Sequence, residues 1–299
     1  MATYTETFVN AFSDFGGYVW KEITFQADPW YINYFWMLVG LSLVVWLLEI
    51  IFPWRKKQPI FRKDFWLDAF FMFFNFYLFK LIIFIAFSKV VSKGLDDLLG
   101  GNLNDLALID LSSQPQWLQL LIFFLLLDFI QWGVHVLLHR VPFLWRFHKV
   151  HHSVEEMGFA AHLRFHWMEH VVYEPAKYIG VMVLGGFAPE QAFIVYYFAI
   201  AIGHLNHANI GWSYGPLKYI FNNPKMHIWH HAEKLPKSHK YGVNYGISLS
   251  IWDYLFRTNY IPSDGRDIKI GFKNRDKYPR SFFQLIFSGF SKTPDEKEE

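Results

Sequence analysis

His148-Lys-Val-His151-His152 and His227-Ile-Trp-His230-His231 are two copies of one short pattern, H-x-x-H-H. All fourteen histidines of the 299-residue chain lie between positions 135 and 239. Spacings of three and four bring side chains to one face of a helix, one turn apart. A single histidine is most often a hydrogen-bonded core or surface residue. Two such motifs, together with His135-x-x-x-His139, instead predict a metal site.

The number of histidines also indicates which metal chemistry to expect. Imidazole suits iron, copper, zinc and nickel, whereas calcium and magnesium prefer oxygen ligands. Zinc needs only about three or four ligands, but roughly ten histidines are available here on five segments, enough for two metal ions. Two neighbouring irons can reduce oxygen and remove hydrogen from an unactivated carbon, which zinc, lacking redox chemistry, cannot do.

Hydrophobic residues make up 53% of the chain and aromatic residues 21%, and the mean hydropathy is +0.14. The apolar residues form long blocks at 34–52, 67–87 and 117–138, and a fourth region, 171–203, is interrupted by glycine and proline. A membrane span needs about 20 apolar residues, so the fourth region is predicted to be a hairpin that crosses or enters the membrane and returns. We therefore expect an all-α integral membrane protein with about four transmembrane helices and a cytoplasmic helical cap that holds a dimetal site.

The charge distribution predicts the orientation of these helices. The loop 53–64 is basic, whereas the N-terminal segment and the loop 88–116 are acidic. By the positive-inside rule the basic loop, the histidines and the C-terminus are cytoplasmic. We expect no cleavable signal peptide, so the first helix would act as an anchor. The net charge of +2 indicates no nucleic-acid partner, and the absence of cysteine excludes disulfides and thiolate metal sites.

Charged residues within the apolar blocks need a partner in the protein. Asp128 shares a helix face with His135 and His139, and we expect it to orient a metal-bound imidazole; an ion pair with Lys80 or Arg140 is the alternative. Lys80 lies near a helix end, where it is expected to reach the membrane interface; a functional cation within the membrane is the alternative. Further along, three histidines four apart are predicted to share one helix face: His162, His166 and His170.

The region 120–260 resembles the fatty acid hydroxylase/sterol desaturase superfamily of membrane di-iron enzymes. The matching runs are Asp128…His135-x-x-x-His139, Trp145-Arg-Phe-His148-x-x-His151-His152, Arg164-Phe-His166-x-x-Glu169, His207-Ala-Asn209, Pro224-Lys-Met-His227-x-x-His230-His231, Asn244-Tyr-Gly246 and Ser250-Ile-Trp-Asp-x-Leu-Phe256. Their order, spacing and flanking residues all agree with the family. The remainder, 1–110, is similar only in being hydrophobic.

The resemblance implies ten metal ligands: His135, His139, His148, His151, His152, His166, His207, His227, His230 and His231. Four further residues are expected to orient these ligands: Asp128, Glu169, His204 and Asn209. By spacing alone, Glu169 and Arg164 are equally compatible with ligand-orienting groups and with a surface ion pair. Whether His162, His170 and His204 are ligands themselves is left open, because they exceed the usual pattern.

The implied reaction is hydroxylation or desaturation of a lipid taken from the bilayer, a fatty acyl, sterol-like or ether lipid, with two irons, O2 and two external electrons. Because no haem-binding or flavin-binding segment is recognisable, the electron donor is expected to be a separate protein or a reduced pterin. Ether-lipid cleavage stays open. A non-catalytic membrane protein that binds metal or haem is the alternative class.

Three regions are expected along the chain. Residues 1–116 would form a membrane anchor with two transmembrane helices, 117–262 the catalytic region, and 263–299 a cytoplasmic tail whose charged end, 293–299, is disordered.

Overall fold

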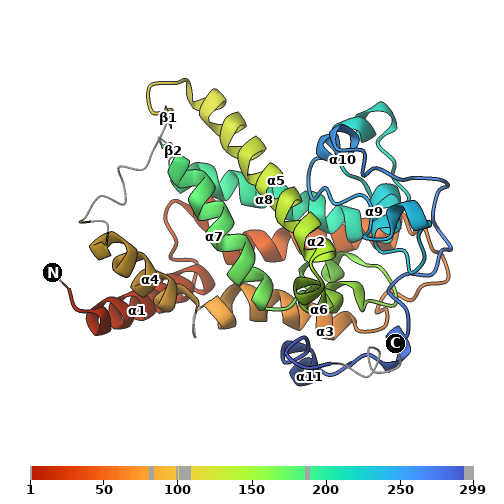
Figure 1. The fold of residues 1–299 in the computed structure, drawn as a ribbon, viewed down its shortest axis with the longest axis horizontal. Coiled ribbons are helices and arrows are strands. Elements are labelled where there is room, and N and C mark those ends of the chain that lie inside the picture. Colours follow the sequence, from red (N-terminus) through yellow and green to blue (C-terminus); the bar gives the residue numbers. More distant parts are fainter. Residues whose placement is uncertain (1, 81–83, 99, 101–108, 186–188, 293–299) are drawn as a thin grey trace.

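The computed structural model describes residues 2–80, 84–98, 100, 109–185 and 189–292. The described residues are mostly helical, as expected (Figure 1). Their α-helices are α1 (Tyr4–Ile23), α2 (Tyr34–Ile51), α3 (Phe65–Phe73), α4 (Ile85–Leu98), α5 (Gln116–Arg140), α6 (Pro142–His152), α7 (Met168–Val183), α8 (Pro189–His207), α9 (Pro224–His230), α10 (Ile251–Leu255) and α11 (Phe282–Ile286). Two-residue strands β1 (Ile109–Asp110) and β2 (Leu184–Gly185) form one short parallel pair.

Side chains next to the helix starts explain where several helices begin. Thr3 and Glu6 form a capping box at the start of α1. Asn33 caps α2 by accepting a hydrogen bond from the backbone N–H of Trp36, and Asn223 caps α9 through the N–H of Met226. Prolines occupy the first position of α6 and of α9, where the missing N–H costs nothing.

Two helices of the described part, α2 and α5, are long and apolar enough to cross a membrane. The predicted block 67–87 is not a single regular helix among the residues described. It is divided between α3, a π-helical turn at Phe74–Leu78 and α4, and residues 81–83 lie outside the described part. The predicted hairpin 171–203 corresponds to α7 and α8, and residues 186–188 between them lie outside the described part of the chain.

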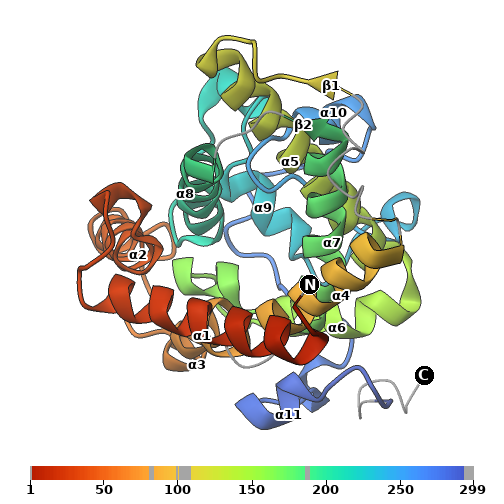
Figure 2. The same cartoon turned by 90° about the vertical axis from the view of Figure 1, so that its left-hand side faces the viewer.

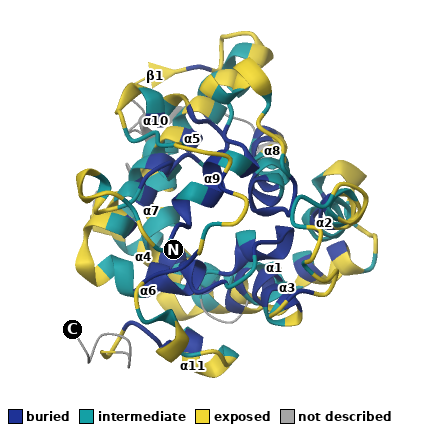
Figure 3. Ribbon diagram, turned by 90° about the vertical axis from the view of Figure 1, so that its right-hand side faces the viewer, coloured by how far each residue is buried: buried dark blue, intermediate teal, exposed yellow. Residues whose placement is uncertain are grey.

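The histidine-bearing helices pack together at the centre. α5 packs on α6, α7 and α8, and α8 in turn packs on α2, α9 and the 3-10 turn Phe159–Leu163. Figure 2 shows α8 and α9 lying between α2 on one side and α5 and α7 on the other. Figure 3 shows that the second half of α6 and nearly all of α9 are buried, whereas α10 and α11 are largely at the surface.

The segment after residue 262 is more than a tail. Phe272, Tyr278 and Leu285 form a buried cluster with Phe71 of α3 and Val150 of α6. The N–H of Gly271 donates a 2.8 Å hydrogen bond to the carbonyl of His231. Residues up to 292 therefore pack against the motif helices. The end predicted to be disordered, 293–299, lies outside the described residues.

Candidate metal centre

Nine histidines gather in two adjoining groups inside the protein. The potential ligand atoms within each group all lie within 4.8 Å of one another. The five-histidine cluster consists of His135, His139, His148, His152 and His230, and the four-histidine cluster of His151, His207, His227 and His231. The two clusters touch, because the rings of His152 and His231 stack with their centroids 4.4 Å apart.

Each H-x-x-H-H motif contributes to both clusters. On α6 the outer residues, His148 and His152, enter the five-histidine cluster, while His151 enters the four-histidine cluster. At α9 the assignment is reversed, since His230 alone joins the five-histidine cluster. The cause is the helical period of 3.6 residues: positions i and i+4 lie nearly in line, whereas position i+3 points about 100° away from position i+4.

Backbone carbonyls hold one nitrogen of several rings. The Nδ1 of His135 donates to the carbonyl of Tyr245 at 2.7 Å, and the Nδ1 of His230 to that of Val243 at 2.8 Å. The Nδ1 of His151 donates to the carbonyl of Arg164 at 3.1 Å. The Nδ1 of His207 donates to the carbonyl of Gly203, 2.8 Å away in α8. A ring that carries its proton on Nδ1 presents the lone pair of Nε2 to the cluster, as a metal ligand must.

The inward nitrogens of the clusters face one another. In the four-histidine cluster the Nε2 of His207 lies 3.2 Å from that of His151 and 3.0 Å from that of His227. In the five-histidine cluster the buried Nε2 atoms of His139, His152 and His230 have no hydrogen-bond partner among the residues that the structure describes. Two nitrogens bound to one metal at about 2.0–2.1 Å, with angles of roughly 90–109°, lie about 2.8–3.4 Å apart. The residues therefore fit a metal ion in each cluster.

The protonation state of the rings agrees with this fit. Burial lowers the pKa of the His151 imidazole to about 3. Burial, together with the neighbouring imidazoles, also lowers the pKa values of His152, His230 and His231 well below the ordinary value. At neutral pH these imidazoles are therefore uncharged, which is the form that binds metal ions.

His166 was predicted as a tenth ligand and lies outside both clusters. Its Nδ1 accepts a hydrogen bond from the N–H of Met168 at 3.0 Å, and its ring packs on Phe147 with centroids 4.9 Å apart. The predicted face shared by His162, His166 and His170 does not form, because residues 164–166 are not helical and the spacing of four has no turn to follow.

The four predicted orienting residues have different surroundings. A carboxylate oxygen of Glu169 lies 3.0 Å from the Nδ1 of His148, at the five-histidine cluster. His204 is a buried ring between the Oγ of Ser42 and the Nδ1 of His162, each 3.1 Å away. Asn209 pairs with the backbone N–H and carbonyl of Arg55 instead of an imidazole.

The imidazole contact predicted for Asp128 is replaced by another one. Its carboxylate accepts hydrogen bonds from the backbone N–H groups of Ser248 and Leu249, at 3.1 and 3.2 Å, and from the indole of Trp252 at 2.9 Å. Asp128 precedes His135 by seven residues, about 10 Å along the helix. It is therefore too far from the ring and instead holds the loop that passes beside α5.

Sequence reasoning missed Asp253 as a positioning residue. It is fully buried and accepts hydrogen bonds from the N–H groups of Tyr245 and Gly246, at 2.9 and 2.7 Å. Asp253 thereby fixes the Tyr245 carbonyl that receives the Nδ1 of His135. The only available signal was its place in the motif Ser250-Ile-Trp-Asp-x-Leu-Phe256.

Arg164, which the sequence offered as a ligand-orienting group, supports His151. The side chain of Arg164 is buried and forms ion pairs with Asp68, at 3.0 Å, and with Asp64, at 3.1 Å. The same guanidinium donates to the Oγ of Ser153 at 2.9 Å. These contacts fix the Arg164 carbonyl to which the Nδ1 of His151 donates.

A cavity of about 310 Å³ adjoins both clusters. His135 and His148 of one cluster and His151, His207 and His227 of the other line it. Apolar and aromatic side chains make most of the remaining wall, among them Phe15, Phe76, Leu163, Phe165, Phe193 and Ile200. An apolar molecule in this cavity would touch both histidine clusters.

The helical fold and the two clusters define a histidine-rich metal-binding protein. Residues 120–258, a little under half of the chain, match the model of the fatty acid hydroxylase family. The match contains all nine clustered histidines together with Asp128, Glu169 and Asp253.

Individual relatives are similar over the same region. An ornithine lipid hydroxylase of Rhizobium tropici is 32% identical over 178 residues, which are 60% of this chain and 52% of that protein. Alkylglycerol monooxygenases of Caenorhabditis elegans and Homo sapiens are 28% and 30% identical over 174 and 138 residues, or 55% and 45% of this chain. Those matches cover 33% and 29% of the two monooxygenases. The chain thus matches about half of the first relative and about a third of the others. No solved structure matches it significantly.

Proposed function

We propose that this protein is a membrane-bound di-iron oxygenase that hydroxylates or desaturates a lipid with O2 and two electrons from a separate donor. The observation that carries the proposal is the pair of adjoining clusters, five and four histidines, on the wall of one apolar cavity. The family match and the names of the relatives, a lipid hydroxylase and alkylglycerol monooxygenases, support it.

Iron is the metal proposed for both clusters. Nine neutral imidazoles and no thiolate suit a borderline transition metal. The nine ligands together also exceed the four that one structural zinc ion needs. The bound irons would supply the reduction of O2 and the oxidation of a carbon–hydrogen bond. A haem would use only one or two axial histidines, which would leave most of the clustered rings unexplained.

The chain's own residues would contribute orientation and exclusion of water. The carbonyls of Tyr245, Val243 and Arg164 and the carboxylate of Glu169 fix the ring orientations. Preorganised ligands need no rearrangement during the reaction. The aromatic lining of the cavity would hold an acyl or alkyl chain beside both clusters and keep bulk water away.

We further propose that α2 and α5 span the membrane. α5 exposes Trp117, Leu121, Leu125 and Phe129 at intervals of four, a stripe that suits lipid better than water. The basic loop before α3 lies beside the histidine motifs, since Lys63 pairs with Glu155 at 2.7 Å. The positive-inside rule would place both on the cytoplasmic side. We also propose that α3, α7 and α8 enter the bilayer. The chain would then divide into a membrane anchor, 1–116, a catalytic region, 117–262, and a C-terminal segment, 263–299.

The test combines metal analysis with lipid analysis. The purified full-length protein should contain about two irons per chain and show no haem absorption. Cells that express it should contain an oxygenated or desaturated lipid that is absent when His151 is replaced by alanine. Zinc in place of iron, a haem spectrum, or identical lipids in both cell lines would each contradict the proposal.

A further inference from the structure

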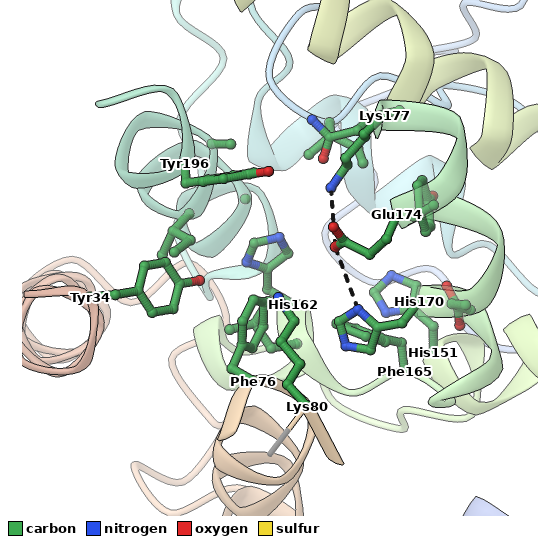
Figure 4. A pocket seen from close by; sticks show the side chains of 18 of the residues that line it. Tyr34, Phe76, Lys80, His151, His162, Phe165, His170, Glu174, Lys177 and Tyr196 are labelled. Atoms are coloured by element: carbon green, nitrogen blue, oxygen red, sulfur yellow. Dashed lines mark ion pairs between the residues drawn. The ribbon is translucent and has the colours of Figure 1, made fainter. Parts of the chain in front are cut away.

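One wall of the cavity is ionic, although the rest is apolar. Lys80, His170, Glu174 and Lys177 line it, and Figure 4 shows them around the space that Tyr34 and Tyr196 face from the other side. Glu174 bridges two of them: its Oε1 lies 3.9 Å from the Nζ of Lys177 and 3.7 Å from the Nδ1 of His170. The sequence favoured a Lys80 that reaches the membrane interface, but here it lines the cavity.

This wall has an excess of positive charge. It has two lysines, Lys80 and Lys177, and one carboxylate, Glu174. The other carboxylate that lines the cavity, Glu169, lies against His148 and not at this wall. The Nζ of Lys80 lies 5.1 Å from the centre of the Phe76 ring. Glu174 attracts Lys80 as well as Lys177, so a single carboxylate is shared between two lysines. A cation in an apolar cavity is costly without a counter-ion.

An unsatisfied donor or acceptor points to the same place. The ring of His170 is buried, and its Nε2 has no hydrogen-bond partner among the described residues. Its other nitrogen is already near Glu174. The two lysines favour an anion at this wall, and the neutral His170 ring can donate to it when its proton is on Nε2.

We propose that this ionic wall binds the anionic part of a lipid headgroup, a carboxylate or a phosphate, at Lys80 and Lys177. The inference rests on the proposed function and adds the class of substrate to it. The apolar part of the cavity then takes the chain of the same lipid and directs it toward His135, His151 and His207.

The geometry of α7 sets how far the headgroup lies from the metal centre. Glu169, Tyr173 and Lys177 follow at intervals of four on the face that lines the cavity. Lys177 is thus about 12 Å along the helix from Glu169, which touches the five-histidine cluster. The site would hold the anion away from the clusters and present a carbon further along the lipid to them.

Matched probes with one chain length test the inference. Hexadecanoate, hexadecyl phosphate and hexadecanol differ only in the headgroup, and their binding to the full-length, metal-containing protein is measured by native mass spectrometry. We expect both anions to bind at least about 10-fold more tightly than the alcohol, as a charge-assisted hydrogen bond provides. Lys80→Gln should abolish this preference and leave the affinity for hexadecanol unchanged.

Control variants and a competitor complete the test. Lys80→Arg keeps the charge and should keep the preference, and Lys89→Gln changes an exposed lysine of α4 and should alter nothing. Lys177→Gln should also reduce the preference, which provides a second variant if Lys80→Gln fails to fold. Equal affinities for the three probes, or an equal loss for all in Lys80→Gln, would overturn the inference. Inorganic phosphate that displaces hexadecyl phosphate at equal concentration would also overturn it, since the site would then take free anions.

The outcomes separate this inference from the proposed function. A protein that prefers the anionic probes but oxidises no lipid would retain the headgroup site and lose the proposed function. A protein that oxidises acids and alcohols equally well, with and without Lys80, would keep the function and lose the headgroup site.

Discussion

The five-histidine cluster and the four-histidine cluster use the same two motifs in opposite ways. On α6 the middle histidine, His151, belongs to the four-histidine cluster, whereas at α9 the middle histidine, His230, belongs to the five-histidine cluster. Each of these two helices therefore supplies both clusters, and neither cluster can form without α6 and α9. In this protein an H-x-x-H-H motif therefore supplies ligands to two neighbouring sites and not to one site alone.

The two clusters differ in what supports them. Tyr245 and Val243, in the loop before α10, and Glu169 hold rings of the five-histidine cluster. The four-histidine cluster instead depends on Gly203, within α8, and on Arg164 with its buried ion pairs. Changes in the loop or at Glu169 should therefore affect the five-histidine cluster first.

The largest effect is expected from removing a corresponding ligand in each cluster. His151→Ala and His230→Ala change the middle histidine of their motifs, one in each cluster. Each should reduce iron from about two to about one per chain and lower lipid oxidation at least about 100-fold, because both metals are needed. Iron analysis and product mass spectrometry measure this. If one variant retains both irons, that histidine is not a ligand.

A smaller effect is expected from the carboxylate at the five-histidine cluster. Glu169→Gln keeps the size of the side chain but removes the carboxyl group beside the Nδ1 of His148, so metal affinity or activity should fall about 10–100-fold. The loss should be confined to one iron. Glu155→Gln removes a partly exposed partner of Lys63 and serves as the control, with an effect near zero. Equal losses in the two variants would mean that charge in general, and not this contact, matters.

Asp128→Asn distinguishes support of the loop from support of a ligand. The amide would lose charge-assisted hydrogen bonds to Ser248, Leu249 and Trp252, so the free energy of unfolding should fall by about 1–3 kcal/mol. Iron per folded chain should fall far less than in Glu169→Gln, because Asp253 still holds the backbone of Tyr245 and Gly246. Thermal unfolding in detergent and iron analysis measure the two effects separately. A loss of iron without a loss of stability would restore the imidazole contact predicted from the sequence.

The smallest effect on iron content is expected at histidines outside the clusters. His166→Ala should leave both irons in place, although loss of its packing on Phe147 should lower stability by about 1 kcal/mol. His239→Ala changes a ring that packs at an angle against Tyr260, in the 3-10 turn Lys237–His239, and should change neither iron content nor activity. Loss of iron in His166→Ala would add a tenth ligand and break the present division into five and four.

Much of the site could be predicted from the sequence, because its signal is local. A helix fixes the relation of residues three and four apart, so spacing alone is enough to pair His135 with His139, and His148 with His152. The same rule failed at His166, where the chain between the 3-10 turn and α7 is not helical. Spacing carries information only where the backbone repeats.

The helical class, the apolar helices α2 and α5, the histidine-rich centre and the residue types that line it could all be predicted from the sequence alone. Only the tertiary structure decided which helices share a cluster and what each acid contacts. It brought Asp128 to a loop 120 residues away and placed Lys80, Glu174 and Lys177 around one cavity. Such contacts depend on how helices that are far apart in the chain pack together. The spacing of side chains within one helix does not indicate which other helices it will contact.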